Sequence, residues 1–232
     1  MSRAAVIIGA SGGIGAALEA ALAEEGEFDR IWGLARSRRG DAHIDIEDEA
    51  SIAAAAGRVA KGPPVHLVIV ATGLLHDATR GPEKALKELD AGWLARSFAV
   101  NAIGPALVAK HFVPLLSPAA APVFAALSAR VGSISDNRLG GWYGYRASKA
   151  ALNMLMKNVA IEASRTAKRS IVVALHPGTV DTPLSKPFQG NVAPGKLFDP
   201  DRAALQLLDV IDGLKPVDTG KVFAWDGEEI LP

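Results

Sequence analysis

A tyrosine and a lysine four residues apart are the best candidates for proton transfer in this 232-residue sequence. Tyr145 and Lys149 stand in the segment YGYRASK, and a spacing of four places them on one face of a helix. Free tyrosine has a pKa of about 10, but a nearby ammonium lowers it, so the pair predicts general acid–base chemistry. Tyr143 has only Ala147 at the same spacing. Such pairs also arise by chance, so the rest of the chain decides their meaning.

Three further polar residues precede this segment. Ser128 follows the apolar run 123–127, where its hydroxyl can hydrogen-bond a substrate carbonyl oxygen, and Ser133 follows on the next loop. We favour Ser128 and keep Ser133 as the alternative. Asn101 falls in a helical pattern, where asparagine is unfavourable unless its side chain holds water or a backbone carbonyl. Each of the three can instead be a capping or exposed polar residue.

A glycine-rich turn, GASGGIG over residues 9–15, joins the first apolar run to the first helical pattern. Glycines permit a tight turn and let the backbone approach a pyrophosphate, and a helix N-terminus supplies free N–H groups. The turn therefore predicts a dinucleotide site. Its spacing differs from the Gly-x-Gly-x-x-Gly fingerprint, and the alternative is a tight turn that binds nothing.

A basic cluster follows the second apolar run. Arg36 and Arg38 stand where an acidic residue would hydrogen-bond the ribose 2′-hydroxyl of NAD, and an arginine there pairs with a 2′-phosphate. The cluster therefore favours NADP(H), with a solvated basic turn as the alternative. Asp45 can accept a hydrogen bond from the adenine amino group, or it can be a turn or capping residue.

Apolar strands alternate with helices along the whole chain. Strands are expected at 4–8, 31–35, 43–46, 65–70, 123–127, 171–175 and 221–225. Helices are expected at 13–25, 48–60, 81–116 with a break near 90–92, 142–166 and 201–211. Such alternation predicts an α/β fold: a Rossmann-like, doubly wound parallel sheet with helices on both faces, which binds ligands at the carboxyl ends of its strands. No repeat or linker interrupts the pattern, so we expect a single domain over residues 1–232.

The composition narrows the class of function. Lys plus Arg and Asp plus Glu number 25 each, and a net charge of zero argues against nucleic acid or an anionic membrane as a partner. The chain has no cysteine, which excludes disulfides, thiolate nucleophiles and cysteine-ligated metals and suits a cytoplasmic protein. The 5 histidines lack the spacing of metal ligands, so we expect no metal site.

Together these features make the sequence similar to the short-chain dehydrogenase/reductase family. The resemblance covers essentially the whole chain. It rests on Gly9, Gly13, Gly15, Asn101, Ser128, Tyr145, Lys149, Pro177 and Gly178. The stretches LSARVGSISDN, GGWYGYRASKAALN and HPGTVDTPL are most similar to the branch of C-factor-like and sniffer-type carbonyl reductases.

The resemblance implies hydride transfer between NADP(H) and a small-molecule carbonyl or secondary alcohol, in a homodimer or homotetramer. Tyr145 would be the acid/base, Lys149 would hold the nicotinamide ribose, and Asn101 would support a proton relay through water. Residues 183–200, rich in proline and glycine, would form the substrate loop. The expected cofactor contacts are Gly9, Ser11, Gly12, Gly13, Ile14, Gly15, Arg36, Asp45, Ile46, Ala71, Gly73, Asn101, Tyr145, Lys149, Pro177, Gly178, Thr179, Val180 and Thr182.

The sequence departs from the family pattern at three places. Ile8 replaces a threonine, Val70-Ala71-Thr72-Gly73 replaces Asn-Asn-Ala-Gly, and Ser128-Ala129 replaces a pair of serines. These departures favour a second hypothesis, a dinucleotide-binding regulatory or signalling protein with little turnover, whereas the intact Tyr145 and Lys149 favour an enzyme. A sugar-nucleotide epimerase is a third hypothesis, which the short part after the sixth strand opposes.

Overall fold

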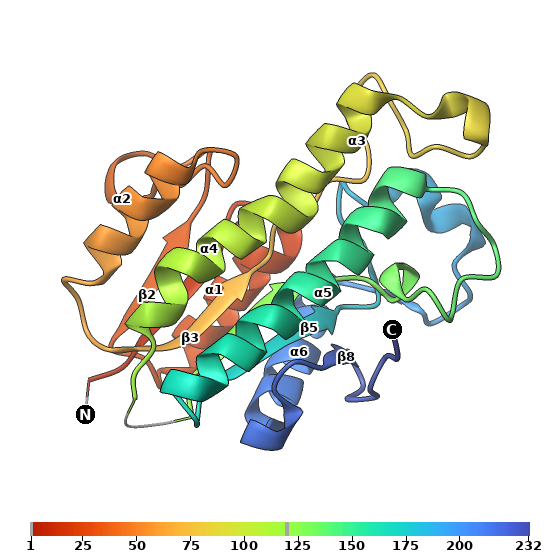
Figure 1. The fold of residues 1–232 in the computed structure, drawn as a ribbon. Helices are drawn as coiled ribbons and strands as arrows, with labels where there is room; N and C mark the ends of the chain where they lie inside the picture. The colour runs from red at the N-terminus through yellow and green to blue at the C-terminus, as the bar shows by residue number, and fades with distance from the viewer. Residues whose placement is uncertain (1, 119–120) are drawn as a thin grey trace.

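The computed structural model of this chain describes residues 2–118 and 121–232. Six parallel strands form one sheet in the order β2-β1-β3-β4-β5-β8, and a short β6-β7 pair lies outside it (Figure 1). The strands are β1 (Ala4–Ile8), β2 (Arg30–Leu34), β3 (Val65–Val70), β4 (Val123–Leu127), β5 (Ile171–His176), β6 (Thr179–Val180), β7 (Leu197–Phe198) and β8 (Val222–Ala224). The helices are α1 (Gly13–Glu25), α2 (Glu49–Val59), α3 (Ala91–Phe98), α4 (Gly104–Phe112), α5 (Tyr143–Thr166) and α6 (Pro200–Gly213).

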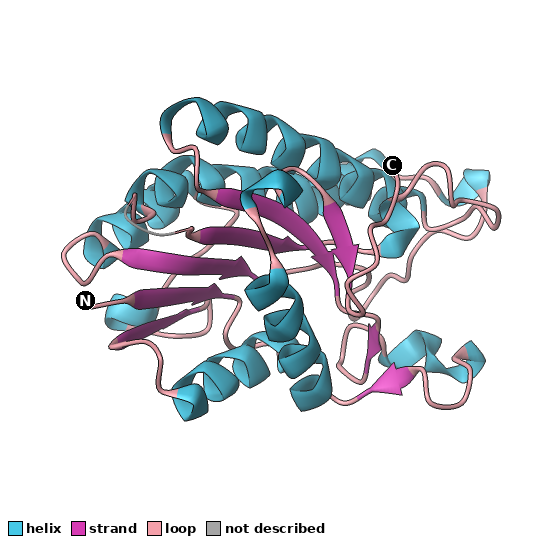
Figure 2. Ribbon diagram, turned by 90° about the horizontal axis from the view of Figure 1, so that it is seen from below, coloured by secondary structure: helices cyan, strands magenta, loops and turns pink. Residues whose placement is uncertain are grey.

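Helices cover both faces of the sheet, so the central strands are apolar throughout. Every residue of β1 is buried. Because side chains alternate along a strand, Val6 and Ile8 join the core under α2, α4 and α5, whereas Ala5 and Ile7 join the core under α1 and α6. Figure 2 shows the strands edge-on between these two layers of helices. The expected Rossmann-like parallel sheet is confirmed.

The strand order reverses beside β1. β1 pairs with β2 on one side and with β3 on the other, and both pairings are parallel. The connections after β1 and β3 therefore diverge to opposite sides, and such a switch point opens a crevice at the carboxyl ends of the strands. This crevice is where the expected site residues should meet.

The starts of the helices follow from their capping residues. The carboxylates of Asp48, Asp90 and Asp199 accept hydrogen bonds from the first backbone N–H groups of α2, α3 and α6. Asp90 also explains the expected break near residues 90–92, because α3 begins at Ala91. Within the described structure no side chain caps α1, whose N-cap is Gly12. The N-terminus of α1 thus keeps its N–H groups for another partner.

The helical stretch after β3 is continuous from Ala91 to Leu115. It contains one π-helical turn, Ala99–Ile103, which carries Asn101, and such turns are frequent at functional sites. By length and composition alone, Ala91–Leu115 is also apolar enough to cross a membrane. In this fold it packs against α2 and α5, and core helices commonly pass the same test.

The structure corrects three expected elements. Residues 43–46 contribute a single bridge between Ala35 and His43 and belong to none of the described strands. The backbone groups that would pair with a neighbouring strand are hydrogen-bonded to side chains instead. Arg58 donates to the His43 carbonyl, and Ser51 accepts from the Asp45 N–H. Residues 81–90, expected to be helical, hold only the short turn Leu86–Glu88 before the cap at Asp90. The segment 183–200, expected to be a loop, contains the turn Lys186–Asn191 and strand β7.

Candidate active site

A cavity of about 470 Å³ opens at the carboxyl ends of the central strands. Its walls come from the turns after β1, β2, β3 and β4, from α5 and from the segment after β5. The expected site residues that line it are Gly9, Ser11, Gly12, Gly13, Ile14, Arg36, Asp45, Ile46, Ala71, Gly73, Ser128, Tyr145, Lys149, Pro177 and Thr182. Outside its described lining are Gly15, Asn101, Gly178, Thr179 and Val180. The fold thus gathers residues more than 170 positions apart into one cavity.

Tyr145 and Lys149 lie one turn apart on α5 and share this cavity. The Lys149 ammonium nitrogen Nζ is 5.8 Å from the centroid of the Tyr145 ring and donates a hydrogen bond of 2.7 Å to the Leu127 carbonyl at the end of β4. Lys149 is only 2% exposed. The lysine is therefore fixed between α5 and the sheet, with its amine beside the phenol.

Burial, rather than the charge of lysine, sets the pKa of both side chains. Tyr145 remains partly open to the cavity, but desolvation by the surrounding protein raises its pKa to about 12. Desolvation also lowers the pKa of Lys149 to about 7. The pKa of Tyr145 is thus shifted upward, opposite to the direction expected from a nearby ammonium, because desolvation of the phenol disfavours the phenolate. Tyr145 is a neutral phenol near neutral pH.

Ser128 and Ser133 have different surroundings. Ser128 lines the cavity, and its hydroxyl donates a 2.6 Å hydrogen bond to Asn153 Oδ1. Ser133 is absent from the described lining, and its hydroxyl donates to the Leu231 carbonyl at 2.6 Å. The structure thus brings Ser128, the favoured serine, to Tyr145. Sequence reasoning missed Asn153, although its spacing of four from Lys149 places it on the same face of α5.

Asn101 is fully buried and clamps the loop after β3. Its Oδ1 accepts from the Leu74 N–H and its Nδ2 donates to the Leu74 carbonyl, each at 2.8 Å. Nδ2 also donates to Ser148 Oγ on α5 at 3.1 Å. The side chain therefore holds a backbone carbonyl, one of the two roles expected for an asparagine inside a helix. It thus connects the π-helical turn, the loop after β3 and α5.

The glycine turn has the shape of a cradle for an anion. Gly9 adopts φ 93°, which favours glycine, and a Cβ on Gly15 would lie 2.2 Å from the Gly9 carbonyl oxygen. A Cβ on Gly13 would meet the Thr182 methyl carbon at 2.7 Å. The first turn of α1 has no acidic side chain, so its N–H groups face the cavity without a competing carboxylate. The turn fits a pyrophosphate.

A buried hydroxyl on the loop after β3 also lacks a partner. Thr72 is one of the residues that line the cavity, and its buried Oγ1 makes no hydrogen bond to any described residue. A buried polar atom without a partner costs free energy, so such an atom in a cavity wall indicates a ligand or water as its partner. Together with the glycine cradle, it is consistent with a polar ligand in this cavity.

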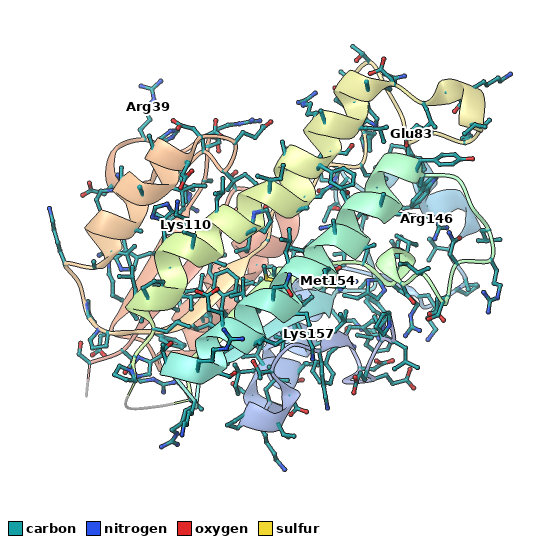
Figure 3. All side chains as sticks on the ribbon, in the orientation of Figure 1. Arg39, Glu83, Lys110, Arg146, Met154 and Lys157 are labelled. Carbon is teal, nitrogen blue, oxygen red and sulfur yellow. The ribbon has the colours of Figure 1, made fainter. Side chains whose placement is uncertain are left out.

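The three arginines after β2 have separate surroundings. Arg36 lines the cavity, its side chain is 65% exposed, and its Nη1 lies 3.2 Å from Glu47 Oε2. Arg38 binds the Glu19 carboxylate through both guanidinium nitrogens, at 2.9 and 2.6 Å, and also donates to the Gly33 carbonyl. The Glu19 hydrogen bonds raise the pKa of Arg38. Arg39 points into solvent at the edge of the molecule (Figure 3). Of the expected basic cluster, only Arg36 faces the cavity.

A buried carboxylate supports the start of α5. Glu83 is 2% exposed, and its Oε2 accepts a 3.2 Å hydrogen bond from the Gly144 N–H (Figure 3). Its backbone carbonyl accepts from the N–H of Trp142, which adopts the left-handed φ of 49°. This unusual start directs the Trp142 ring edge-on to Tyr145, with the centroids 6.3 Å apart.

Aromatic side chains form the wall beyond Tyr145. The Trp142 ring packs against Phe188, with centroids 5.1 Å apart, and Phe188 packs edge-on against His76 at 5.7 Å. The His76 ring nitrogen Nε2 is 3.1 Å from the Pro183 carbonyl oxygen. These contacts join the segment after β6 to the loop after β3. Across the described residues, no group of three His, Cys, Asp or Glu side chains is arranged to hold a metal ion.

Comparison with known proteins supports this geometry. The C-signal of Myxococcus xanthus is 37% identical over 146 residues, which are 63% of this chain and 82% of that protein. The 1-hydroxy-2-glutathionyl-2-methyl-3-butene dehydrogenase of Rhodococcus sp. (strain AD45) is 31% identical over 230 residues, 96% of each chain.

Solved structures agree on the fold. The NADPH-bound carbonyl reductase from chicken fatty liver matches with a TM-score of 0.83 and 25% identity, over 100% of this chain and 94% of that one. The carbonyl reductase Sniffer of D. melanogaster matches with a TM-score of 0.77 and 22% identity over the whole of both chains. The model of the short chain dehydrogenase family matches residues 3–192. The expected resemblance is thus confirmed, and the chain belongs to the short chain dehydrogenase family of oxidoreductases.

Proposed function

We propose that this chain transfers a hydride between NADP(H) and the carbon of a carbonyl or secondary alcohol, with Tyr145 exchanging the proton on oxygen. One observation carries the proposal: Tyr145, Lys149 and Ser128 line the same cavity as the glycine turn and Arg36. The similarity to a carbonyl reductase that binds NADPH supports the choice of cofactor.

The residues around the cavity suit the parts of the cofactor. The free N–H groups at the start of α1 suit the pyrophosphate, and Arg36 suits a 2′-phosphate. Asp45 lines the cavity beside Arg36; one of its carboxylate oxygens accepts from the Glu47 N–H, and the other suits the adenine amino group. Lys149 suits the nicotinamide ribose, and Pro177 and Thr182 line the wall near it.

The protonation of Tyr145 favours carbonyl reduction. When bound, the reduced nicotinamide supplies a hydride, which carries both electrons to the carbonyl carbon. Tyr145 is protonated at neutral pH because burial raises its pKa to about 12, so it can donate its hydroxyl proton to the carbonyl oxygen. The product is an alcohol with the new C–H and O–H bonds. Ser128 would hold the substrate oxygen by donating its hydroxyl proton, which must turn from Asn153 Oδ1 toward the cavity. The phenolate regains its proton from water by way of the Lys149 ammonium, which is reprotonated from solvent.

The substrate end of the cavity is bounded by residues 183–200, which we take as the substrate loop of a single domain over residues 1–232. Pro183 and Leu184 line the cavity, and the Phe188–Trp142 contact sets the loop against the catalytic helix. A homodimer or homotetramer through α5 is part of the proposal, since Met154, on the outer face of α5, is 62% exposed (Figure 3).

A second candidate function is a regulatory or signalling protein that binds the dinucleotide with little turnover. The similarity to C-signal supports it, as does the Ser128 hydroxyl, which is already donated to Asn153 rather than to the cavity. Turnover separates the two candidates.

The test is a measurement of NADPH oxidation by absorbance with a panel of aldehydes and ketones. We expect Tyr145→Phe to lower kcat by about 10²- to 10⁴-fold, because the general acid is lost. NADPH binding, measured by calorimetry, should persist in Tyr145→Phe. Tyr143→Phe is the matched control and should keep full activity. If the wild type binds NADPH tightly but does not oxidise it with any carbonyl compound, the proposed enzymatic function is overturned. The regulatory function then remains.

A further inference from the structure

Arg36, the expected partner of a 2′-phosphate, forms an ion pair with the Glu47 carboxylate at the cavity wall. Its Nη1 is 3.2 Å from Glu47 Oε2, and both side chains line the cavity beside Asp45 and the glycine turn. The Glu47 side chain is 32% exposed, half the exposed fraction of the Arg36 side chain at 65%. The backbone N–H of Glu47 donates to Asp45 Oδ1 at 3.0 Å, which fixes the turn that presents the carboxylate. A cation and an anion therefore stand side by side at this end.

The other arginines after β2 do not pair with Glu47 in place of Arg36. Arg38 is bound to Glu19 on α1 through both guanidinium nitrogens, and Arg39 points into solvent. The other cations of the described lining, Arg96 and Lys149, belong to α3 and α5. A 2′-phosphate bound at this end of the cavity would thus have Arg36 as its guanidinium partner, with the Glu47 carboxylate as an immediate neighbour.

The two side chains prefer different riboses. A carboxylate accepts a hydrogen bond from the 2′-hydroxyl of NAD(H), whereas a guanidinium pairs with the 2′-phosphate of NADP(H). To bind Arg36, a 2′-phosphate must replace the Glu47 carboxylate as its partner. The phosphate then lies next to that carboxylate, which has the same charge. A 2′-hydroxyl can donate to Glu47 while the ion pair stays intact. The pair therefore weakens the preference that Arg36 alone would give.

We propose that Glu47 is a specificity-determining residue that lowers the preference of this chain for NADPH over NADH. The inference rests on the proposed function only in that a dinucleotide occupies this cavity. Because the pair is largely exposed, solvent screens it and the effect is modest. Removal of the Glu47 charge should raise the NADPH-to-NADH affinity ratio by about fivefold.

The test is calorimetric titration of the protein with NADPH and with NADH, without any substrate. Glu47→Gln keeps the shape of the side chain and removes its charge, so it should bind NADPH more tightly and NADH more weakly than the wild type. Glu49→Gln is the matched control, because Glu49 is an exposed acid on α2 that pairs with Lys110 outside the described lining of the cavity. It should leave the ratio unchanged.

The outcomes separate this inference from the proposed function. Glu47→Gln that binds both dinucleotides with the wild-type ratio, or with a lower one, overturns the role of Glu47 and leaves the proposed function intact. An equal rise in Glu49→Gln would also overturn it, because the effect would then come from overall charge. A wild type that binds neither dinucleotide overturns both proposals.

Discussion

The end of the cavity beside Arg36 and the end beside Tyr145 differ in the exposure of their charged groups. Beside Arg36 the charged groups are exposed and paired, Arg36 with Glu47. Beside Tyr145 they are enclosed: Lys149 is 2% exposed and its amine is bonded to a backbone carbonyl. Water and salt screen the first end, whereas desolvation governs the second. One chain thus holds an exposed recognition region and an enclosed reaction region in which Tyr145 and Lys149 have shifted pKa values.

This difference indicates where substitutions should matter. At the enclosed end, a lost charge or hydrogen bond leaves its partner without water, so the cost is large. At the exposed end, water replaces the lost partner, so the cost is small. Three predictions follow that order.

The largest expected effect is on the pH dependence of stability, through Lys149. Its pKa is about 7 in the folded chain and 10.5 for a lysine in water, so between these pH values the unfolded chain binds more protons. Stability contributed by this group therefore rises with pH from about 7 toward 10, by roughly 4 kcal/mol. Lys149→Met should remove this rise in urea unfolding measured across that range. Lys157→Met, on an exposed face of α5, should keep it; a wild-type rise that survives in Lys149→Met contradicts the account.

A smaller effect is expected from the buried clamp at Asn101. Asn101→Ala leaves the Leu74 N–H and carbonyl without their partners and should lower the free energy of unfolding by about 2 kcal/mol. The matched control is Asn137→Ala, whose Oδ1 accepts from the Gly140 N–H at an exposed turn and which should cost below about 0.5 kcal/mol. Equal losses in chemical denaturation would contradict the contrast between enclosed and exposed regions.

The smallest effect is expected at Arg36. Arg36→Ala should weaken NADPH binding by about tenfold, because one charged hydrogen-bond partner of a phosphate is lost, and should change NADH binding little. Arg39→Ala, which removes the same charge from a side chain in solvent, should change neither. An equal loss of affinity for NADPH and NADH in Arg36→Ala would refute the assignment of Arg36 to the phosphate.

Local patterns predicted the scaffold well. β1, β3 and β4 have the expected bounds, because each is a short and mainly apolar run. Tyr145 and Lys149 share one helical face, and both line the cavity with most of the expected glycine turn. The strand expected at residues 43–46 was wrong, because its backbone groups bind side chains from α2.

Contacts between distant segments could not be predicted. Nothing local in Arg38 reveals that Glu19 holds it. The bonds from Asn101 to Leu74 and from Ser128 to Asn153 cross 27 and 25 residues. The pKa of Tyr145 depends on how completely the protein surrounds it, a property of the assembled cavity, and so its direction was expected with the wrong sign.

Transfer of a labelled hydride tests the central claim most directly. The protein is incubated with NADPH deuterated at C4 of the nicotinamide and a ketone that it turns over, and the alcohol is examined by mass spectrometry and NMR. We predict one deuterium on the former carbonyl carbon and a solvent-derived proton on its oxygen. An alcohol formed without deuterium from either C4-labelled form of the cofactor would contradict hydride transfer in this cavity.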